Sequence, residues 1–329
     1  MALGEFDLIK RYFVRPASRA VLGVGDDCAL LKLAPGMQLA VSTDMLVEGR
    51  HFLSTVAPRH LGHKALAVNL SDLAACGARP LAYTLALSLP RADEAFLSAL
   101  ADGLHTLADA HGIELVGGDT TAGPLNICIT VMGEVPAGRA LLRSGARDGE
   151  DLWVSHALDG GIGDARLALE VFRGTVQLPG EAFARVRQAM ECPQPRVALG
   201  MALRGVASAA IDLSDGLMGD LGHVLARSGC AGSPLGAIIR LDDMPRSAIL
   251  ADQPAPLQAQ CLLAGGDDYE LLFAAPPGQR LQVTEAARTA GVAVRCIGQL
   301  QAEPGIVVHD GQGRPVPTPW TGFDHFKAG

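Results

Sequence analysis

Six short acidic motifs stand beside glycine, serine or threonine in otherwise apolar stretches of this 329-residue chain. They are Gly25-Asp26-Asp27, Ser42-Thr43-Asp44, Ser71-Asp72, Gly117-Gly118-Asp119, Asp212-Leu213-Ser214-Asp215-Gly216 and Gly265-Gly266-Asp267-Asp268. A carboxylate that ends an apolar segment is costly to desolvate unless a cation or hydrogen-bond donors compensate it. Magnesium prefers oxygen ligands and takes only a few of them from protein, the rest coming from phosphates and water. We therefore interpret the motifs as a polyvalent magnesium site.

Two of the motifs are predicted to lie where a strand ends. The 42–44 motif follows the apolar residues 39–41, and Asp119 follows residues 114–116 through two glycines. Ligands of α/β sheets usually bind at that edge of the sheet. A helix N-cap at the 42–44 motif and an ordinary double-glycine turn before Asp119 are the alternatives.

The 212–216 motif is predicted to join a strand to a helix. Ser214 or Asp215 would cap that helix, whereas Asp212 lies inside an apolar strand and needs another partner. For the motif at residues 25–27, taken alone, an ordinary polar turn is the favoured interpretation. His51 follows the 42–44 motif in a loop, where a lone polar side chain is usually solvated.

Composition and charge restrict the partners of the chain. The net charge is −8, which argues against a nucleic-acid partner, because phosphate backbones are bound by clustered basic residues. Only four lysines occur, so arginine, backbone amides or metal must neutralise any polyphosphate ligand; they are Lys10, Lys32, Lys64 and Lys327. Paired cysteines and a His-Glu-x-x-His motif are missing, which disfavours zinc. The sequence has no apolar run long enough to span a bilayer and no signal-peptide pattern, so we expect a cytoplasmic protein without a membrane partner.

Periodicity predicts a mixed α/β first half and a second domain of similar class. In the first half, strands are expected at residues 38–42, 81–89, 113–116 and 125–135, and helices at 58–77 and 93–111. Glycine and arginine interrupt the apolar sequence between residues 136 and 151, which predicts domains at 1–138 and 139–329. In the second, strands are expected at 152–155, 209–213, 237–241, 269–274, 294–300 and 306–309, and helices at 164–172, 181–190, 196–206, 217–228 and 281–290.

Taken in order, the motifs and their flanking residues resemble those of the thiamine-monophosphate kinases. The segments are Gly-Val-Gly-Asp-Asp-Cys-Ala (23–29), Ser-Thr-Asp-Met-Leu-Val-Glu-Gly-Arg-His-Phe (42–52), Val-Asn-Leu-Ser-Asp-Leu-Ala-Ala-Cys-Gly-Ala (68–78), Gly-Gly-Asp-Thr-Thr (117–121), Ile-Asp-Leu-Ser-Asp-Gly-Leu (211–217), Gly-Gly-Asp-Asp-Tyr-Glu-Leu (265–271) and Gly-Phe-Asp-His-Phe (322–326). Each motif is weak alone, but their order and spacing are specific and cover nearly the whole chain.

The resemblance implies an α/β (α+β) fold of two domains, of the aminoimidazole-ribonucleotide-synthetase type. It implies a homodimer joined through the N-terminal sheets. The N-terminal domain would bind ATP and magnesium, and the C-terminal domain would complete the phosphate and substrate site. The implied reaction transfers the γ-phosphoryl group of ATP to thiamine monophosphate and gives thiamine diphosphate. We expect direct in-line transfer without a phosphoenzyme, with several Mg²⁺ ions as cofactor.

The resemblance also implies a role for individual residues. The implied magnesium ligands are Asp27, Ser42, Thr43, Asp44, Asp72, Asp119, Asp212 and Asp215. The implied ATP contacts are Gly117, Gly118, Arg143 and Ser214. The implied substrate contacts are His51, Asp267 and Phe323. Two of these depart from the family, in which position 267 is usually Glu and position 323 is often Tyr.

Two other classes of function remain open. One is a related ATP-dependent enzyme, such as a selenophosphate or purine-biosynthetic synthetase. The closing aromatic segment and Asp267 favour the thiamine branch, and residues 1–9 lack the reactive Cys and Lys of a selenophosphate synthetase. The other is a metal-stabilised binding or scaffold protein that does not turn over.

Overall fold

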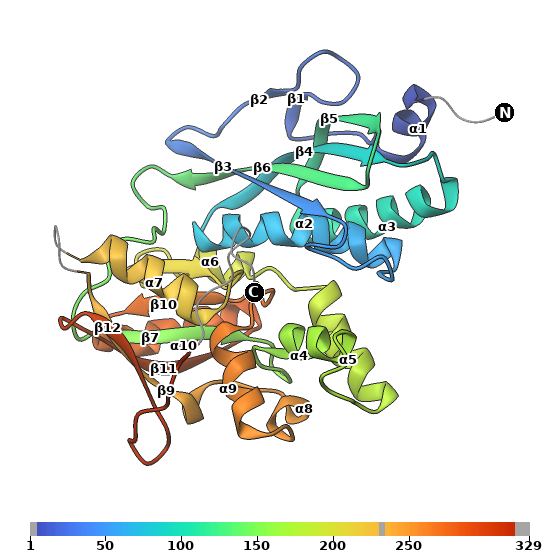
Figure 1. Ribbon diagram of the computed structural model, residues 1–329. Coiled ribbons are helices and arrows are strands. Elements are labelled where there is room, and N and C mark those ends of the chain that lie inside the picture. The colour runs from blue at the N-terminus through green and yellow to red at the C-terminus, as the bar shows by residue number, and fades with distance from the viewer. Residues whose placement is uncertain (1–4, 230–233, 320–329) are drawn as a thin grey trace. The chain divides into compact units, whose positions relative to one another are not determined.

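The computed structural model describes residues 5–229 and 234–319, and the described chain forms two compact units (Figure 1). Unit 1 comprises the residues up to 73 together with 78–138. Unit 2 comprises residues 74–77 together with the residues from 139 onward. Each unit has its own sheet, so the mixed α/β class expected from the sequence is confirmed.

Unit 1 is built on a four-stranded sheet in the order β3-β6-β4-β5, in which only β4 and β5 run parallel. Its strands are β1 (Ala20–Leu22), β2 (Leu30–Leu31), β3 (Met37–Val47), β4 (Arg79–Leu89), β5 (Glu114–Ala122) and β6 (Asn126–Pro136). Its helices are α1 (Glu5–Tyr12), α2 (Pro58–Ala75) and α3 (Glu94–His111). The short strands β1 and β2 pair only with each other.

The helices α2 and α3 cover one face of this sheet (Figure 1). Along β4, Tyr83, Leu85 and Leu87 are buried, whereas Thr84 and Ala86 between them remain at least partly exposed. This alternation is typical of a sheet with one covered face, because successive side chains point to opposite sides. The covered face is the core of unit 1.

Local sequence signals fix the ends of α3. The side chain of Asp93 accepts hydrogen bonds from the backbone N–H groups of Ala95 and Phe96, both at 3.1 Å, and Gly112 ends the helix with φ of 59°. A carboxylate cap and a left-handed glycine stop are strong helix boundaries. The helix predicted at 93–111 is therefore confirmed, and the one predicted at 58–77 is confirmed as α2.

Unit 2 is built on a six-stranded sheet in the order β12-β9-β11-β7-β10-β8, antiparallel except for the β12–β9 pair. Its strands are β7 (Asp151–His156), β8 (Ala209–Asp212), β9 (Gly236–Arg240), β10 (Leu271–Ala275), β11 (Ala293–Gln301) and β12 (Gly305–His309). Its α-helices are α4 (Asp164–Phe172), α5 (Gly180–Glu191), α6 (Val197–Ala202), α7 (Leu217–Ser228), α8 (Ala248–Ala251), α9 (Ala255–Ala264) and α10 (Arg280–Ala290). Two short 3-10 turns are η1 (Leu241–Asp243) and η2 (Pro277–Gln279).

The main core of unit 2 lies between one sheet face and the helices α4, α5, α7 and α9. Val154 and Leu272, which are cross-strand partners, belong to it. Trp153 and Phe273 are also partners but point to the other face, where their rings stack 6.4 Å apart. Apolar side chains thus occupy both faces of the central strands, as expected for strands buried on both sides.

Several elements differ from the sequence prediction. The helices α1, α8 and α9 and the small β1–β2 sheet were not predicted. The strand predicted at 38–42 continues to Val47, and the strand predicted at 113–116 continues to Ala122. The prediction that the 42–44 motif and Asp119 follow strand ends is therefore wrong. Both lie inside strands, because pairing with β6 and β4 continues through them.

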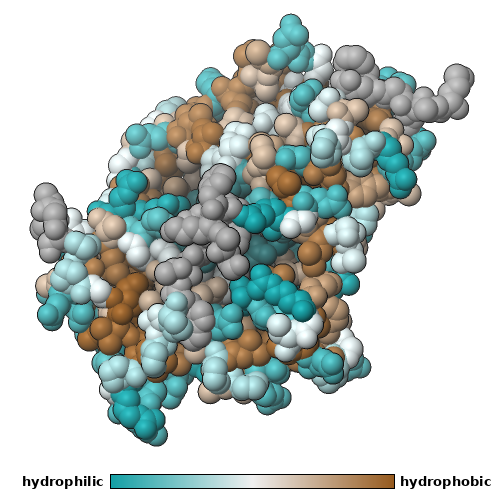
Figure 2. All heavy atoms as spheres, in the orientation of Figure 1, coloured by the Kyte–Doolittle hydropathy of each residue, from teal (hydrophilic) through white to brown (hydrophobic). Residues whose placement is uncertain are grey.

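Large hydrophobic side chains reach the surface of unit 1. Figure 2 shows hydrophobic residues interspersed with hydrophilic ones on the face that it depicts. On β3, Leu39, Val41 and Met45 are 48%, 56% and 53% exposed. They alternate along the strand and so share one face of the sheet. Within residues 5–229 and 234–319, no helix is long and apolar enough to cross a membrane.

We predict that Gly103→Ala destabilises the protein. A Cβ atom at Gly103 of α3 would lie 1.8 Å from the backbone oxygen of Arg59 in α2, so the two helices would have to separate. Overpacking of this kind costs roughly 1 to 3 kcal/mol. Thermal unfolding measures the loss.

The matched control for that variant is Gly222→Ala in α7. A Cβ atom at Gly222 would meet nothing within 4 Å. We expect this substitution to raise stability by up to about 1 kcal/mol through helix propensity. Equal melting temperatures for the two variants would contradict the close α2–α3 contact.

Candidate functional site

In unit 1, three of the predicted magnesium ligands lie between β3 and α2. The hydroxyl of Ser42 donates a hydrogen bond to the Asp72 carboxylate, in the last turn of α2. The backbone N–H of Asp44 donates to the side-chain oxygen of Asn69 at 3.1 Å, and the Asn69 amide donates to Ala65 at 3.0 Å. Ser42 and Asp44 share a sheet face by alternation, so the structure brings Ser42, Asp44 and Asp72 to one side of the sheet.

Thr43 and Asp119 lie on the opposite face. The hydroxyl oxygens of Thr43 and its partner Thr130 are 2.9 Å apart. The same cross-strand row continues through Thr84 to Gly117, and Asp119 stands two residues further along β5. Because cross-strand partners share a face, the predicted ligands of unit 1 form two groups on opposite faces.

The two glycines before Asp119 differ in what they require. Gly118 has φ of 153°, and a Cβ atom there would lie 1.9 Å from the Leu85 backbone oxygen. A Cβ atom at Gly117 would make an ordinary contact, 3.8 Å from the Thr84 side chain. Only glycine therefore fits at position 118, because the β4–β5 pairing brings the two backbones together there.

Asp27 and His51 lie in turns of unit 1. The backbone N–H of Asp27 donates to the Asp26 carboxylate at 2.8 Å, in an exposed turn that follows Gly25. The Nδ1 atom of His51 accepts a hydrogen bond from the Val47 N–H at 3.0 Å. A neutral His51 therefore carries its proton on Nε2.

In unit 2, the two acidic loops leave neighbouring strands and are joined through their backbones. Asp212 is the partner of Leu271 in the β8–β10 pair. Beyond this pair, the N–H of Asp267 donates to the oxygen of Ser214 at 2.9 Å, and that of Tyr269 donates to Leu213 at 2.8 Å. The structure thus joins the loops of Ser214 and Asp267 directly beside Asp212, at the end of β8.

The side chain that holds the first loop is Asp220, in the first turn of α7. Its Oδ2 atom accepts hydrogen bonds from the backbone N–H groups of Ser214 and Asp215, each at 3.1 Å. The alternative role of Ser214 or Asp215 as a helix cap is excluded, because Gly216 occupies the N-cap of α7 and no side chain caps it.

Electrostatics distinguish Asp220 from ordinary acids. Burial, and after it the nearby Asp215 charge, raises the pKa of its carboxyl group to about 7. The two N–H donors and the positive charge of Arg143 oppose this shift in pKa. Arg143 therefore acts electrostatically on Asp220.

The second acidic loop carries backbone strain. Asp267 and Tyr269 have φ of 64° and 52°, in the left-handed region that side chains disfavour. The Tyr269 hydroxyl donates to the Asp267 carboxylate at 3.1 Å. Such strain persists only where the surrounding structure imposes it, and it gathers at functional sites. This marks the loop around Asp267 as a candidate site.

Two further acids of that loop act on the surrounding structure. The buried Glu270 accepts hydrogen bonds from Arg196, whose Nε lies 2.6 Å away, and from the Ser155 hydroxyl. Asp268 accepts the N–H of Gly163 at 2.8 Å, and burial raises the pKa of its carboxyl group well above the usual range. The roles of Asp220 and Glu270 were not predicted from the sequence. The available signal was an acid next to apolar residues: Asp220 precedes Leu221, and Glu270 precedes Leu271.

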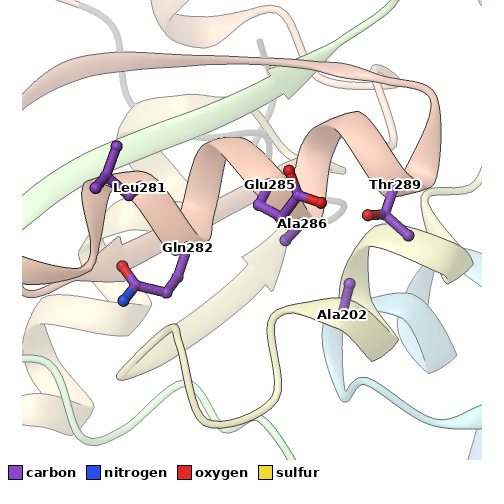
Figure 3. Close-up of a pocket in the computed structure, with 6 residues that line it drawn as sticks. All are labelled: Ala202, Leu281, Gln282, Glu285, Ala286 and Thr289. Carbon is purple, nitrogen blue, oxygen red and sulfur yellow. The ribbon is translucent and has the colours of Figure 1, made fainter.

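A surface pocket lies elsewhere in unit 2, between α6 and α10 (Figure 3). It has a volume of about 470 Å³ and is lined by Ala202, Leu281, Gln282, Glu285, Ala286 and Thr289. The only ionisable side chain among these is Glu285, which pairs with Arg288. None of the lining residues belongs to an acidic motif, so this pocket is not the candidate site.

The donor set of the acidic motifs fits magnesium. Among residues 5–229 and 234–319, no three His, Cys, Asp or Glu side chains converge as a metal site would require. The predicted ligands nevertheless offer only carboxylate and hydroxyl oxygens, and Ser42 and Asp72 already lie within hydrogen-bond distance of each other. Oxygen donors in small groups suit an ion that keeps phosphate and water ligands. Phe323, a predicted substrate contact, lies outside the described residues.

The N-terminal part of the chain matches a known protein family. Residues 25–135 match the family described as AIR synthase related protein, N-terminal domain. This segment contains the strands of unit 1 that carry the predicted magnesium ligands. This part of the chain is thus similar to the N-terminal domain of AIR synthase related proteins.

The particular family follows from full-length relatives. A thiamine-monophosphate kinase of Salmonella typhimurium is 45% identical over 331 residues, covering 99% of each chain. The crystal structure of a thiamine-monophosphate kinase from Stenotrophomonas maltophilia K279a is 42% identical, with a TM-score of 0.81 over 88% of this chain and 91% of that one. The structure of AaThiL complexed with AMPPCP and TMP is 27% identical, with a TM-score of 0.75 over 90% and 89%. This chain belongs to the thiamine-monophosphate kinase family.

We predict that Gly118→Ala lowers stability, because the added Cβ atom would overlap the Leu85 backbone at the β4–β5 pair. The loss is expected to reach at least about 2 kcal/mol, as for other side chains forced into a positive φ and a close packing contact. Gly117→Ala is the matched control and should unfold within about 1 kcal/mol of the parent protein. Thermal unfolding of both variants measures the difference; a tolerated Gly118→Ala would contradict the geometry described for this strand.

Proposed function

We propose that this protein transfers the γ-phosphoryl group of ATP to thiamine monophosphate and so forms thiamine diphosphate. Membership of the thiamine-monophosphate kinase family over the full chain carries this proposal. The relative that holds AMPPCP and TMP supports both substrates. The oxygen donors of the acidic motifs fit a phosphate-transfer site that is neutralised by metal, in a chain with only four lysines.

We assign the metal and nucleotide contacts as the family resemblance implies. Asp72, with Ser42 and Asp44 across from it, offers oxygen ligands in unit 1, as do Asp27, Thr43 and Asp119; Asp212 and Asp215 do so in unit 2. Bound Mg²⁺ would supply charge neutralisation for the phosphate oxygens. Gly117, Gly118, Arg143 and Ser214 are the proposed nucleotide contacts. The Arg143 guanidinium supplies positive charge where a chain poor in lysine needs it.

The proposed substrate contacts differ in what they donate and accept. The Nε2–H of His51 is a donor suited to a phosphate oxygen, because Nδ1 already accepts from Val47. The Asp267 carboxylate is an acceptor, held by the Tyr269 hydroxyl. An acceptor there suits an amino group on a heterocycle. Phe323 completes the proposed set.

No general base is needed for this transfer. The second pKa of a phosphate monoester is near 6, so the accepting phosphate is already largely dianionic at neutral pH. The protein must instead position two anions and neutralise their charge, which is how phosphoryl transfer is usually catalysed. We therefore propose direct in-line transfer without a phosphoenzyme.

The two domains of the chain would have different roles. Residues 1–138 would bind ATP and magnesium and form the dimer, and residues 139–329 would provide the remaining phosphate and substrate contacts. A homodimer is supported by Leu39, Val41 and Met45, whose exposed side chains share one face of the unit 1 sheet. A cytoplasmic location, where ATP is available, belongs to the same proposal.

The central prediction concerns turnover. ADP release with ATP and Mg²⁺ should rise strongly when thiamine monophosphate is added, and thiamine diphosphate should accumulate in equal amount. Asp119→Asn and Asp212→Asn should each lower kcat at least about a hundredfold, because each removes a carboxylate ligand of the Mg²⁺ that would neutralise the phosphate charge. Coupled ADP assays and thermal unfolding on the same samples measure both effects.

Other results would select another function. A protein that hydrolyses ATP without a response to thiamine monophosphate would be a related synthetase with a different acceptor. Binding of ATP without any ADP release would indicate a binding protein. Loss of folding in both Asn variants, with no separate effect on kcat, would mean that these acids are structural.

We also predict a mass of two chains in light scattering of the purified protein. Val41→Glu should shift the protein to the mass of one chain, because it places a charge on the exposed hydrophobic face of β3. Leu281→Glu, at an 83% exposed position of unit 2, is the matched control and should leave the mass unchanged. A parent protein with the mass of one chain would refute the dimer.

A further inference from the structure

The buried Asp220 carries an inference beyond the residues that the family resemblance marks. Its side chain is removed from solvent, at 2% exposure, although it stands only five residues after the partly buried Asp215. Its Oδ2 atom accepts two consecutive backbone N–H groups, those of Ser214 and Asp215. These two N–H groups belong to residues with proposed roles toward nucleotide and metal.

The helix that carries Asp220 does not require this carboxylate. The backbone N–H of Asp220 already donates to the Gly216 oxygen at 3.0 Å, which begins the hydrogen bonding of α7. Among the described residues, the carboxylate bonds to the N–H groups of Ser214 and Asp215, which lie outside the helix. A buried acid beside the Asp215 charge is unfavourable for stability, and its position is explained by the loop that it holds.

The contact also reaches the second acidic loop. The peptide group between Ser214 and Asp215 donates its N–H to Asp220 at 3.1 Å and accepts, at the Ser214 oxygen, the N–H of Asp267 at 2.9 Å. A shift of this peptide group would therefore move both loops together. The orientation of Asp267, already strained at φ of 64°, depends on the same peptide.

We infer that Asp220 is a positioning residue: its carboxylate fixes the peptides of Ser214 and Asp215 and thereby aims their side chains at the nucleotide. The inference rests on the proposed function for the reaction and for the nucleotide contact of Ser214. The role needs an acceptor oxygen at one place more than it needs a negative charge. This separates it from the metal ligands, for which charge is essential.

Three substitutions at this position test the inference. Asp220→Ala removes the acceptor and should raise the KM for ATP and the Kd for a non-hydrolysable ATP analogue at least about tenfold, because two hydrogen bonds are lost. Asp220→Asn keeps an acceptor oxygen and should stay within about threefold of the parent protein in both. Asp220→Glu keeps the charge but moves the oxygens by one methylene, and should resemble Asp220→Ala.

The control is Glu150→Ala, which removes another buried carboxylate of unit 2. Glu150 accepts the backbone N–H of Arg147 at 3.0 Å and the Ser208 hydroxyl, away from the acidic loops. We expect it to lower the melting temperature without changing the KM or Kd for nucleotide. If Asp220→Ala does not fold, the Glu and Asn variants still give the comparison.

Calorimetric binding of the analogue and steady-state kinetics give separable outcomes. The inference is overturned if Asp220→Ala and Asp220→Glu bind the analogue as the parent does, or if Asp220→Asn is as impaired as they are. If the parent protein binds the analogue but shows no response to thiamine monophosphate, the proposed function fails. Weaker analogue binding by Asp220→Ala would still support the inference in that case.

Discussion

Backbone N–H groups that compensate desolvated carboxylates determine the shape of the acidic loops in unit 2. Asp220 accepts the N–H groups of Ser214 and Asp215, and Asp268 accepts that of Gly163. A carboxylate removed from water without such donors would destabilise the fold by several kcal/mol. Each acid therefore ties one loop to a fixed place, and the strained backbone at Asp267 is retained because its neighbours are fixed.

In unit 1, side chains rather than backbone N–H groups hold the acidic motifs in place. Its acids lie on a sheet and on the end of a helix, where Asp72 accepts the Ser42 hydroxyl and Asn69 accepts the Asp44 N–H. The sheet offers positions on both faces, and Gly118 lets β5 approach β4 closely enough for this arrangement. The rigid sheet thus presents oxygen donors, whereas the loops of unit 2 depend on their own hydrogen bonds.

Sequence reasoning located the helices whose ends carry local signals, such as α3 between Asp93 and Gly112, and α7. It failed where pairing between distant strands decides the outcome. Polar residues at 42–44 and at Asp119 suggested strand ends, but their partners on β6 and β4 keep them inside strands, because strand formation depends on cross-strand neighbours more than on intrinsic preference. The roles of Asp220 and Tyr269 were equally hidden, since both act through residues that only the fold brings near. Order and spacing of the motifs, by contrast, were sufficient to indicate the family.

The chemistry that follows from this arrangement is a transfer between two anions, in which the protein contributes position and charge. No side chain has to become a covalent carrier, since the accepting phosphate is a sufficient nucleophile once its charge is neutralised. The stereochemical course at the transferred phosphorus tests this claim most directly, with ATP made chiral at its γ-phosphorus by oxygen isotopes and thiamine monophosphate as acceptor. A single in-line displacement predicts inversion of configuration in the thiamine diphosphate formed. Retention would indicate two displacements through a phosphoenzyme and would contradict the account.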